Sequence, residues 1–389
     1  MKEGWEYKKL GEVGEFVRGG NFSKKDFVEN GFPCIHYGQI HMRFGVETFK
    51  HLSSVPAEMV KPNRCAKKGD LVIAITSEDD AGSCKCTAWM GDYDAYVGGH
   101  TVIYRHTMQP KYVSYYFMSP FFQKDKLEFT HGFKVVEISP KDIAKIQIPI
   151  PPLSEQQSIV DYLDSAFAKI DAMKANAEKA LNEAKALFQS SLKEMLEPKE
   201  GWEEKLLGDV CAITSLLVNP LEEQYKKLLH VGGANIISES GEFIDLKTAE
   251  EENLISGKFL FDTEDVLYNK IRPYLKKVAR PDFSGLCSAD MYPLRHKDCI
   301  SRDFLYYVLI TKNFTDYAIL NSGRAGMPKV NRQTLFAYRF ALPSLNEQQS
   351  IVETLDSLKS KVDSLQENYV KISQECDALK QAILRQVFE

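Results

Sequence analysis

The sequence LSEQQSIV at residues 153–160 decides the organisation of this chain, because a near copy, LNEQQSIV, stands at residues 345–352. A second matching pair opens the two halves: GWEYKKLGEV at residues 4–13 and GWEEKLLGDV at residues 201–210. Between these anchors the two halves diverge. The chain therefore contains one unit of roughly 190 residues written twice, with similar ends and a different middle.

The regions that follow the two EQQ copies predict long helices. Ser154 with Gln157, and Asn346 with Gln349, have the spacing of a capping box. Apolar or small residues then recur at heptad spacing. In the second copy these positions are Ile351, Leu355, Leu358, Val362, Leu365, Tyr369, Ile372, Cys376, Leu379 and Ile383. In the first copy they are Ile159, Leu163, Ala166, Ile170, Met173, Ala177, Ala180, Ala184, Leu187 and Ser191.

These two heptad patterns keep the same phase, with bulky residues in one helix opposite small residues in the other. We therefore expect the two helices to pack on each other, each about 40 residues or roughly 60 Å long. A seam of this kind is also found in homo-oligomeric coiled coils, which is the alternative interpretation. The matched phases favour a pair within one chain.

The remaining regions predict mixed structure. Residues 71–75 and 101–104 have the composition of strands, and residues 146–148 alternate as a strand does. Residues 112–127 and 303–319 carry aromatic and aliphatic side chains at helical spacing, which we expect to form the core.

The predicted fold class is α+β. Two similar globular α/β domains, residues 1–152 and 199–344, are each followed by a long helix, residues 153–198 and 345–389. We expect these helices to pack as an antiparallel coiled coil and to give the chain a pseudo-two-fold internal repeat.

Charge is distributed unevenly along the 389 residues, whose formal net charge is −5. The first domain carries +2 and the second −1, whereas each predicted helix region carries −3. No apolar run reaches the roughly 18 residues of a membrane span, and the N-terminus lacks the core of a signal peptide. The eight cysteines are scattered along the chain, which is typical of reduced thiols in the cytoplasm.

Sequence signatures of catalysis are missing. There is no phosphate-binding loop and no dinucleotide-binding glycine motif. Residues 219–222, NPLE, begin like the NPPY motif of adenine methyltransferases but lack the aromatic residue that stacks on a flipped base. The CKC at residues 84–86 has the wrong spacing for zinc. We therefore expect neither a catalytic site nor a metal site.

The repeated segments resemble a known family. Residues 148–160 and 340–352 look like the boundary between recognition domain and helix in specificity subunits of type I restriction-modification systems. The openings at residues 4–13 and 201–210 resemble the start of each target recognition domain there. The resemblance covers the whole chain in the same order: variable domain, helix, variable domain, helix.

This resemblance implies a non-catalytic subunit that recognises double-stranded DNA at a bipartite target, two half-sites with a non-specific spacer. It implies two copies of a modification (methyltransferase) subunit as partners, with restriction–translocation subunits as further partners. S-adenosylmethionine, and ATP with magnesium where restriction occurs, are expected on those partners, so that this chain itself holds no cofactor.

Glycine-containing basic loops are the candidate DNA contacts, because cations neutralise phosphates while Arg and Asn can read guanine and adenine edges. The candidates in the first domain are Arg18, Asn21, Lys24, Lys25, His131 and Lys134. Those in the second domain are Lys270, Arg272, Lys276, Lys277, Arg324, Lys329, Asn331 and Arg332. A solvated basic face is the alternative for any one of them. We expect the isolated chain to bind DNA weakly, since the first domain is only slightly positive.

Two other functions fit parts of the pattern. A coiled-coil adaptor that scaffolds protein partners without DNA readout would share the helices but would not need the basic loops. A self-contained DNA methyltransferase or nuclease would need the motifs that are missing.

Overall fold

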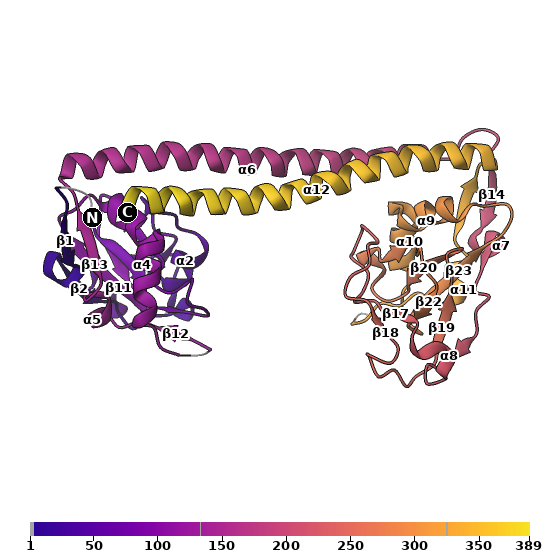
Figure 1. The fold of residues 1–389 in the computed structure, drawn as a ribbon, viewed down its shortest axis with the longest axis horizontal. Helices are drawn as coiled ribbons and strands as arrows, with labels where there is room; N and C mark the ends of the chain where they lie inside the picture. The colour runs from indigo at the N-terminus through magenta and orange to yellow at the C-terminus, as the bar shows by residue number, and fades with distance from the viewer. Residues whose placement is uncertain (1–3, 133, 324–325) are drawn as a thin grey trace. The chain divides into compact units, whose positions relative to one another are not determined.

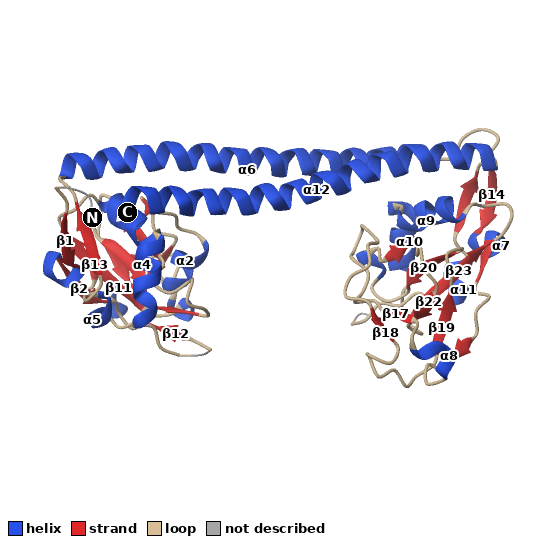
Figure 2. Ribbon diagram, viewed as in Figure 1, coloured by secondary structure: helices blue, strands red, loops and turns tan. Residues whose placement is uncertain are grey.

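The computed structural model describes residues 4–132, 134–323 and 326–389. The chain forms two compact units: unit 1 consists of Met1–Ala177 with Tyr369–Glu389, and unit 2 of Glu178–Asn368. Each unit contains both sheet and helix, as Figure 2 shows. The two long helices, α6 (Leu153–Met195) and α12 (Leu345–Phe388), are each divided between the units (Figure 1).

Unit 1 is built on two larger sheets and two small ones within the described residues. The five-stranded sheet has the order β2 (Gly14–Arg18), β11 (Thr101–His106), β7 (Leu71–Ala74), β9 (Cys86–Trp89) and β4 (Glu47–Thr48). The four-stranded sheet has the order β5 (Ser53–Val55), β3 (Phe32–Ile35), β10 (Ala95–Val97) and β6 (Cys65–Ala66). The two-stranded sheets pair β1 (Glu6–Lys9) with β13 (Gln147–Ile150) and β12 (Val136–Glu137) with β8 (Thr76–Ser77).

Unit 2 repeats much of this arrangement. Its four-stranded sheet has the order β15 (Cys211–Ala212), β23 (Met291–His296), β20 (Asp265–Asn269) and β21 (Val278–Ala279). Its five-stranded sheet has the order β16 (Leu217–Val218), β19 (Lys258–Phe261), β22 (Gly285–Cys287), β17 (Leu229–Val231) and β18 (Lys247–Thr248). A two-stranded sheet pairs β14 (Glu203–Leu206) with β24 (Arg339–Leu342).

Short helices complete each unit. Those of unit 1 are α1 (Leu10–Val13), α2 (Tyr37–Met42), α3 (Pro110–Met118), α4 (Pro120–Asp125) and α5 (Pro140–Ile143). Those of unit 2 are α7 (Leu207–Val210), α8 (Glu223–Lys226), α9 (Arg302–Ile310), α10 (Lys312–Leu320) and α11 (Arg332–Phe336). The strands predicted at residues 71–75 and 101–104 are confirmed as β7 and β11.

The aromatic helical segments lie in the core, as predicted, but each is interrupted. Ser119 accepts a hydrogen bond from Phe122 N and so caps α4, whose first residue is Pro120. Thr311 caps α10 in the same way, accepting from Phe314 N. Each predicted helix is therefore a pair of helices, because a capping hydroxyl takes over where the backbone turns.

The two EQQ copies are explained by one buried glutamine in each. Gln156 and Gln348 are 1% and 0% exposed. Gln156 accepts from Gln109 N at 2.8 Å and donates to Pro151 O at 2.8 Å. Gln348 accepts from Ser301 N at 2.9 Å and donates to Pro343 O at 3.0 Å. Each glutamine thus ties the start of a long helix to the residue that precedes α3 or α9.

The glycine–tryptophan openings make a second repeated contact. Trp5 Nε1 donates to Glu155 Oε1 at 2.9 Å, and Trp202 Nε1 donates to Glu347 Oε2 at 3.0 Å. The strands that follow pair in equivalent registers, Glu6 with Ile150 and Glu203 with Leu342. These contacts fix the beginning of each repeat against the start of its own long helix.

The two long helices pack on each other within each unit. In unit 1, Lys380 Nζ lies 2.5 Å from Asp171 Oδ1, and Lys174 Nζ lies 3.6 Å from Asp377 Oδ1. Because residue numbers rise along one helix as they fall along the other, the pairing is antiparallel, as predicted. In unit 2, Lys185 Nζ donates to Gln366 Oε1 at 2.7 Å.

The predicted seam of α6 is wrong at alternate positions beyond Ile170, whereas Ala177, Ala184 and Ser191 are half-buried as predicted. Met173 and Leu187, placed at the seam by the sequence pattern, are 59% and 58% exposed. Leu181 and Phe188 are buried instead. At these alternate positions the buried side chain stands one residue later, because a helix of 3.6 residues per turn does not keep a strict seven-residue spacing. Large side chains of α6, rather than alanines, therefore contribute to the core.

The predicted seam of α12 needs one change. Leu379 is 47% exposed, and the adjacent Lys380 places its ammonium 5.2 Å from the centre of the Phe167 ring. Near the end of the helix, Leu384 and Phe388 are buried in the core of unit 1, where Phe388 meets the rings of Tyr112 and Tyr116.

The predicted capping boxes are wrong as well. Both long helices begin one residue before the expected caps, at Leu153 and Leu345. Gln157 therefore donates to Asp161, one turn along the helix. In the second copy, Ser344 Oγ accepts from Glu347 N at 3.4 Å. Pro152 and Ser344 thus stand where Ser154 and Asn346 were expected.

Candidate nucleic-acid interface

Equivalent loops come together at the same edge of the sheets in both units. We call residues 18–25, 36–42, 76–85, 98–100, 131–132 and 134–140 the loop end of unit 1. Gly98 N donates to Ile35 O at 2.9 Å, and β8 pairs with β12. The loop end of unit 2 is residues 230–235, 269–277, 288–290, 322–323 and 326–332. There Ser288 N donates to Val231 O at 2.9 Å, and Ile271 bridges to Lys329.

The glycine loop of unit 1 is pinned rather than flexible. Gly20 N donates to Val97 O at 2.6 Å, and Arg64 donates to Gly19 O at 2.8 Å. A Cβ on Gly19 would lie 2.0 Å from Gly98 O, so only glycine permits this approach of two backbones. The loop therefore holds its flanking polar side chains in fixed positions.

The predicted contacts of unit 1 lie on exposed parts of this loop end. Arg18 ends β2, and Asn21, Lys24 and Lys25 follow the pinned glycines. His131 forms a bridge with Glu137, and Lys134 lies in the turn between them. The pairing of β8 with β12 and the hydrogen bonds of Gly19 and Gly20 bring these residues to one edge of the unit. Their role as DNA contacts stays a prediction.

A cleft at this loop end brings in residues that the sequence reasoning missed. It is lined by Lys24 together with Tyr37, His41, Lys85 and His100. The Tyr37 ring centre lies 5.4 Å from that of His100 and 6.1 Å from that of His41. The sequence signal for His100 was its position after two glycines and immediately before the strand β11.

In unit 2 the loop end carries a network of lysines around one carboxylate. Lys329 Nζ lies 3.3 Å from Asp290 Oδ1, and Lys270 Nζ lies 3.5 Å from the same oxygen. Lys270 is 8% exposed and also donates to Ala289 O. Burial, reinforced by the charge of Lys329, lowers the pKa of Lys270. Its ammonium is turned toward the protein, which favours a role in holding the loops together.

The other predicted DNA contacts of unit 2 differ in whether their side chains are already hydrogen-bonded within the protein. Lys277 Nζ donates to Gly233 O at 2.5 Å, whereas Asn331 uses its side-chain oxygen to cap α11 by accepting from Thr334 N. Arg272 and Lys276 make no side-chain hydrogen bond or ion pair with the part of the chain that the structure describes. Arg324 lies outside the described residues.

Arg332 is the first residue of α11 and is exposed. Its guanidinium carbon lies 5.7 Å from the centre of the Phe259 ring and 5.8 Å from that of Tyr292. Both rings are 5% exposed. Contacts of this kind between guanidinium and aromatic faces are attractive and orient the planar cation.

Backbone strain is found at both loop ends. Cys84 and His100 in unit 1 have φ of 60°, and Arg272 and Lys276 in unit 2 have φ of 52° and 47°. Residues other than glycine rarely adopt this left-handed backbone conformation. Such strained residues are often found at functional sites. Three other non-glycine residues with positive φ, Glu239, Asp245 and Asn253, lie elsewhere in unit 2.

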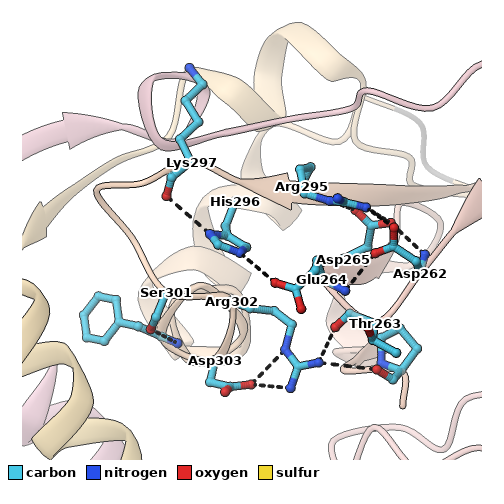
Figure 3. Close-up of polar contacts among 12 residues, drawn as sticks. Asp262, Thr263, Glu264, Asp265, Arg295, His296, Lys297, Ser301, Arg302 and Asp303 are labelled. Atoms are coloured by element: carbon cyan, nitrogen blue, oxygen red, sulfur yellow. Dashed lines mark hydrogen bonds and ion pairs between the residues drawn. The ribbon is translucent and has the colours of Figure 1, made fainter. Parts of the chain in front are cut away.

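Cations at the opposite end of β20 are paired within the protein, as Figure 3 shows. Arg295 contacts both Asp262 and Asp265 at 2.7 Å. His296 Nε2 lies 3.3 Å from Glu264 Oε2. Arg302 donates to Asp303 and to Thr263 O. Because Arg295 pairs with Asp265 at the start of β20, this network is about 13 Å along the strand from Asn269.

Unit 1 has a simpler version of this support. Arg105 Nε lies 3.5 Å from Asp70 Oδ2, and Asp70 accepts from Lys67 N as Asp265 accepts from Asp262 N. Asp70 in the sequence GDLV (residues 69–72) and Asp265 in TEDVL (residues 263–267) thus hold equivalent structural ion pairs. Among the described residues, no group of three or more His, Cys, Asp or Glu side chains is arranged to hold a metal ion. None of the described helices is both long and apolar enough to span a bilayer.

We call the contacts that both units share, above all those of Gln156 and Gln348 and of Trp5 and Trp202, the frame of each unit. A module that occurs twice, with the same frame and with different loops at one end, defines the class of duplicated recognition proteins. The chain matches the family model described as the type I restriction modification DNA specificity domain twice, over residues 2–183 and 199–374. It therefore belongs to the type I restriction-modification DNA specificity family. The coiled-coil adaptor without DNA readout is not favoured.

Individual relatives agree with this assignment. The chain is 30% identical over 291 residues to the EcoDI specificity subunit of Escherichia coli, covering 66% of this chain and 65% of that protein. It is 22% identical over 425 residues to the StySPI specificity subunit of Salmonella potsdam, covering 100% of this chain and 89% of that protein. Both relatives are named as specificity subunits of type I restriction enzymes.

The fold is also found among solved structures. One chain of the structure described as "Structural basis underlying complex assembly and conformational transition of the type I R-M system" has a TM-score of 0.78. The sequence identity is 19%, and the match covers 100% of this chain and 98% of that one. At this identity the likeness shows a shared fold, with two mixed domains and two long helices.

Proposed function

We propose that this chain reads a bipartite DNA target, with residues 1–152 recognising one half-site and residues 199–344 the other. The observation that carries the proposal is the contrast between the two repeats. Their frames share the buried glutamine and the tryptophan contact, whereas their loop ends carry different side chains. Equal frames dock equally, and different loops contact different base edges.

We further propose that the paired helices set the distance between the half-sites and that two modification subunits bind equivalent surfaces of the repeat. S-adenosylmethionine is then held by those subunits, as are ATP and magnesium by restriction–translocation subunits where these join. DNA methylation of this kind takes place in the cytoplasm. The modest charge of unit 1 leaves much of the affinity for DNA to the partners.

The test is to co-express the chain with its neighbouring methyltransferase and to map methylated motifs across the genome. Residues 199–343 are then exchanged for the corresponding region of another specificity subunit. One half-site should change while the other half-site and the spacer stay the same, because the two readers are independent. A change in both half-sites would contradict the proposal.

A matched deletion tests the role of the helices. Contacts of α6 with α12 keep one register, so removal of residues 174–180 with residues 371–377 takes out facing heptads. The pair then shortens by about 10 Å, equal to roughly three base pairs. We expect a shorter spacer or loss of assembly, with unchanged half-sites. A deletion in α6 alone is the control, since it breaks the register. An active complex with new half-sites and the old spacer would overturn this part of the proposal.

A further inference from the structure

Four of the cations at the loop end of unit 2, Lys270, Lys277, Lys329 and Arg332, fall into two groups. Lys270, Lys277 and Lys329 direct their ammonium groups to carbonyl or carboxylate oxygens of the chain itself. Arg332 lies on aromatic rings, and none of the described carboxylates is within ion-pair distance of it. The first group is satisfied by the protein, whereas Arg332 uses only part of its guanidinium on the Tyr292 hydroxyl. Because a guanidinium has five N–H donors, others remain available to a ligand.

The surroundings of Arg332 restrict how its side chain can point. Phe259 and Tyr292 lie beneath the guanidinium, and both rings are held in the sheets of unit 2. Lys270 lies 4.9 Å from the centre of the same Tyr292 ring, so a second positive charge opposes any inward turn. An oriented guanidinium loses less conformational entropy on binding than a free arginine side chain.

The chemistry of the guanidinium selects one base edge. It presents parallel N–H donors and no acceptor. In the major groove guanine offers two acceptors, O6 and N7, at a matching separation, whereas adenine presents an amino donor beside N7. An arginine held in one plane can therefore bond both guanine acceptors but meets a donor on adenine.

We propose that Arg332 is a base-reading residue of this subunit and that it recognises a guanine in the half-site read by unit 2. Lys270 and Lys329 are positioning residues, which hold the loops on either side of it through Asp290. The proposal rests on the proposed function of the chain. Unit 1 has Pro140 at the equivalent first position of α5, where no donor is present. The reading is therefore specific to unit 2.

The experiment uses the full chain co-expressed with its methyltransferase subunits, with methylated motifs mapped by sequencing. Arg332→Ala should remove the preference for guanine at one position of one half-site, raising methylation of the substituted sites about 10-fold or more relative to the guanine site. Arg332→Lys should restore affinity with a weaker preference than the wild type, because a lysine ammonium can donate to guanine but lacks the planar fork. Arg339→Ala is the matched control, an arginine of the same unit that is also exposed and pairs with Glu204 in the frame; it should leave the motif unchanged.

Other outcomes would overturn the proposal. Equal loss of methylation at every sequence, with a shallower dependence on salt, would make Arg332 a phosphate contact. An unchanged motif, or a change in the half-site assigned to unit 1 by domain exchange, would remove it from base reading. In these cases the wild-type motif remains bipartite and the proposed function stands. A wild-type complex with no bipartite motif would overturn both.

Discussion

The two units of this protein share a frame and differ at their loop ends. The frame is repeated down to individual hydrogen bonds, since Gln156 and Gln348 make the same pair of contacts. At the loop ends, His100 of unit 1 is replaced by Asp290 of unit 2, and Pro140 by Arg332. Buried contacts depend on many neighbours at once, whereas exposed loop residues depend on few. A duplicated chain can therefore acquire two specificities without losing its fold.

The frame itself contains one instructive difference. Tyr115 and Tyr307 both donate to an aspartate of a long helix, Asp164 or Asp356, at 2.5 Å. The cation that binds each aspartate comes from a different element in the two units. Lys111 in α3 binds Asp164, whereas Arg280, which follows β21, binds Asp356. The acid and the tyrosine are thus equivalent in the two repeats, and the cation is supplied independently.

The largest effect that tests the comparison is expected at the seam of α6. Phe188 is 9% exposed and belongs to the core of unit 2, while its neighbour Leu187 is 58% exposed. Phe188→Ala should lower the free energy of unfolding by about 3–4 kcal/mol through lost burial and a cavity. Leu187→Ala should change it by less than about 0.5 kcal/mol. Denaturant unfolding of both variants measures the difference. Equal effects would support the original heptad phase and contradict the observed seam.

The seam shows how far the sequence could predict the fold. The repeat, the two long helices and their mutual packing follow from matched anchors and heptad spacing. The side chains that meet at the seam do not, because a shift of one residue keeps the same average pattern. Leu181 and Phe188 become buried through contacts with the rest of their unit. A heptad pattern contains no information on those contacts.

A smaller effect is expected where the two frames differ in their ion pairs. Asp356 binds Arg280 through both carboxylate oxygens, at 3.3 and 2.7 Å, and also accepts from Tyr307. Asp356→Ala should destabilise the protein by about 2–3 kcal/mol, since a largely buried arginine loses a bidentate partner and keeps only Asp303, at 3.3 Å. Asp164→Ala should cost less, about 1–2 kcal/mol, because Lys111 loses a single contact and keeps Glu47 closer, at 3.0 Å.

The measurement for this pair is denaturant unfolding of both alanine variants beside the wild type. The double variants Asp356→Ala with Arg280→Met, and Asp164→Ala with Lys111→Met, give the coupling energy in each frame. A coupling in unit 1 equal to or greater than that in unit 2 would contradict the expected order.

The candidate site was less predictable than the fold. The basic glycine loops were located by composition, but the sequence could not separate cations that bind the protein from cations that face solvent. Lys270 and Arg332 each follow an asparagine in the sequence, so their neighbours do not distinguish them. Only the sheet places Lys270 against Ala289 O and Arg332 over Phe259. The cleft with Tyr37 and His100 was missed because its residues come from segments distant in sequence.

The smallest effect concerns a histidine that occupies equivalent ends of β11 and β23. His296 of unit 2 lies beside Glu264, whereas the two ring nitrogens of His106 in unit 1 are buried. Burial lowers the pKa of His106 to about 4. Between this value and about 6.5 the unfolded chain binds the proton and the folded chain does not, so stability rises with pH through this window.

Lowering the pH from 8 to 5 should therefore remove about 1–2 kcal/mol of stability from unit 1 through His106. His106→Phe keeps a ring beside Tyr104, and in this variant the loss of stability that is due to His106 should disappear. If the variant is less stable than the wild type at pH 8, the difference between the two unfolding free energies should be smaller at pH 5. Unfolding free energies at both pH values measure the change, and hydrogen exchange assigns it to a unit. The amides of unit 1 should open first on acidification of the wild type. An equal loss of stability in wild type and variant would show that His106 stays solvated in the folded protein, and the two repeats would then respond alike to acid at this position.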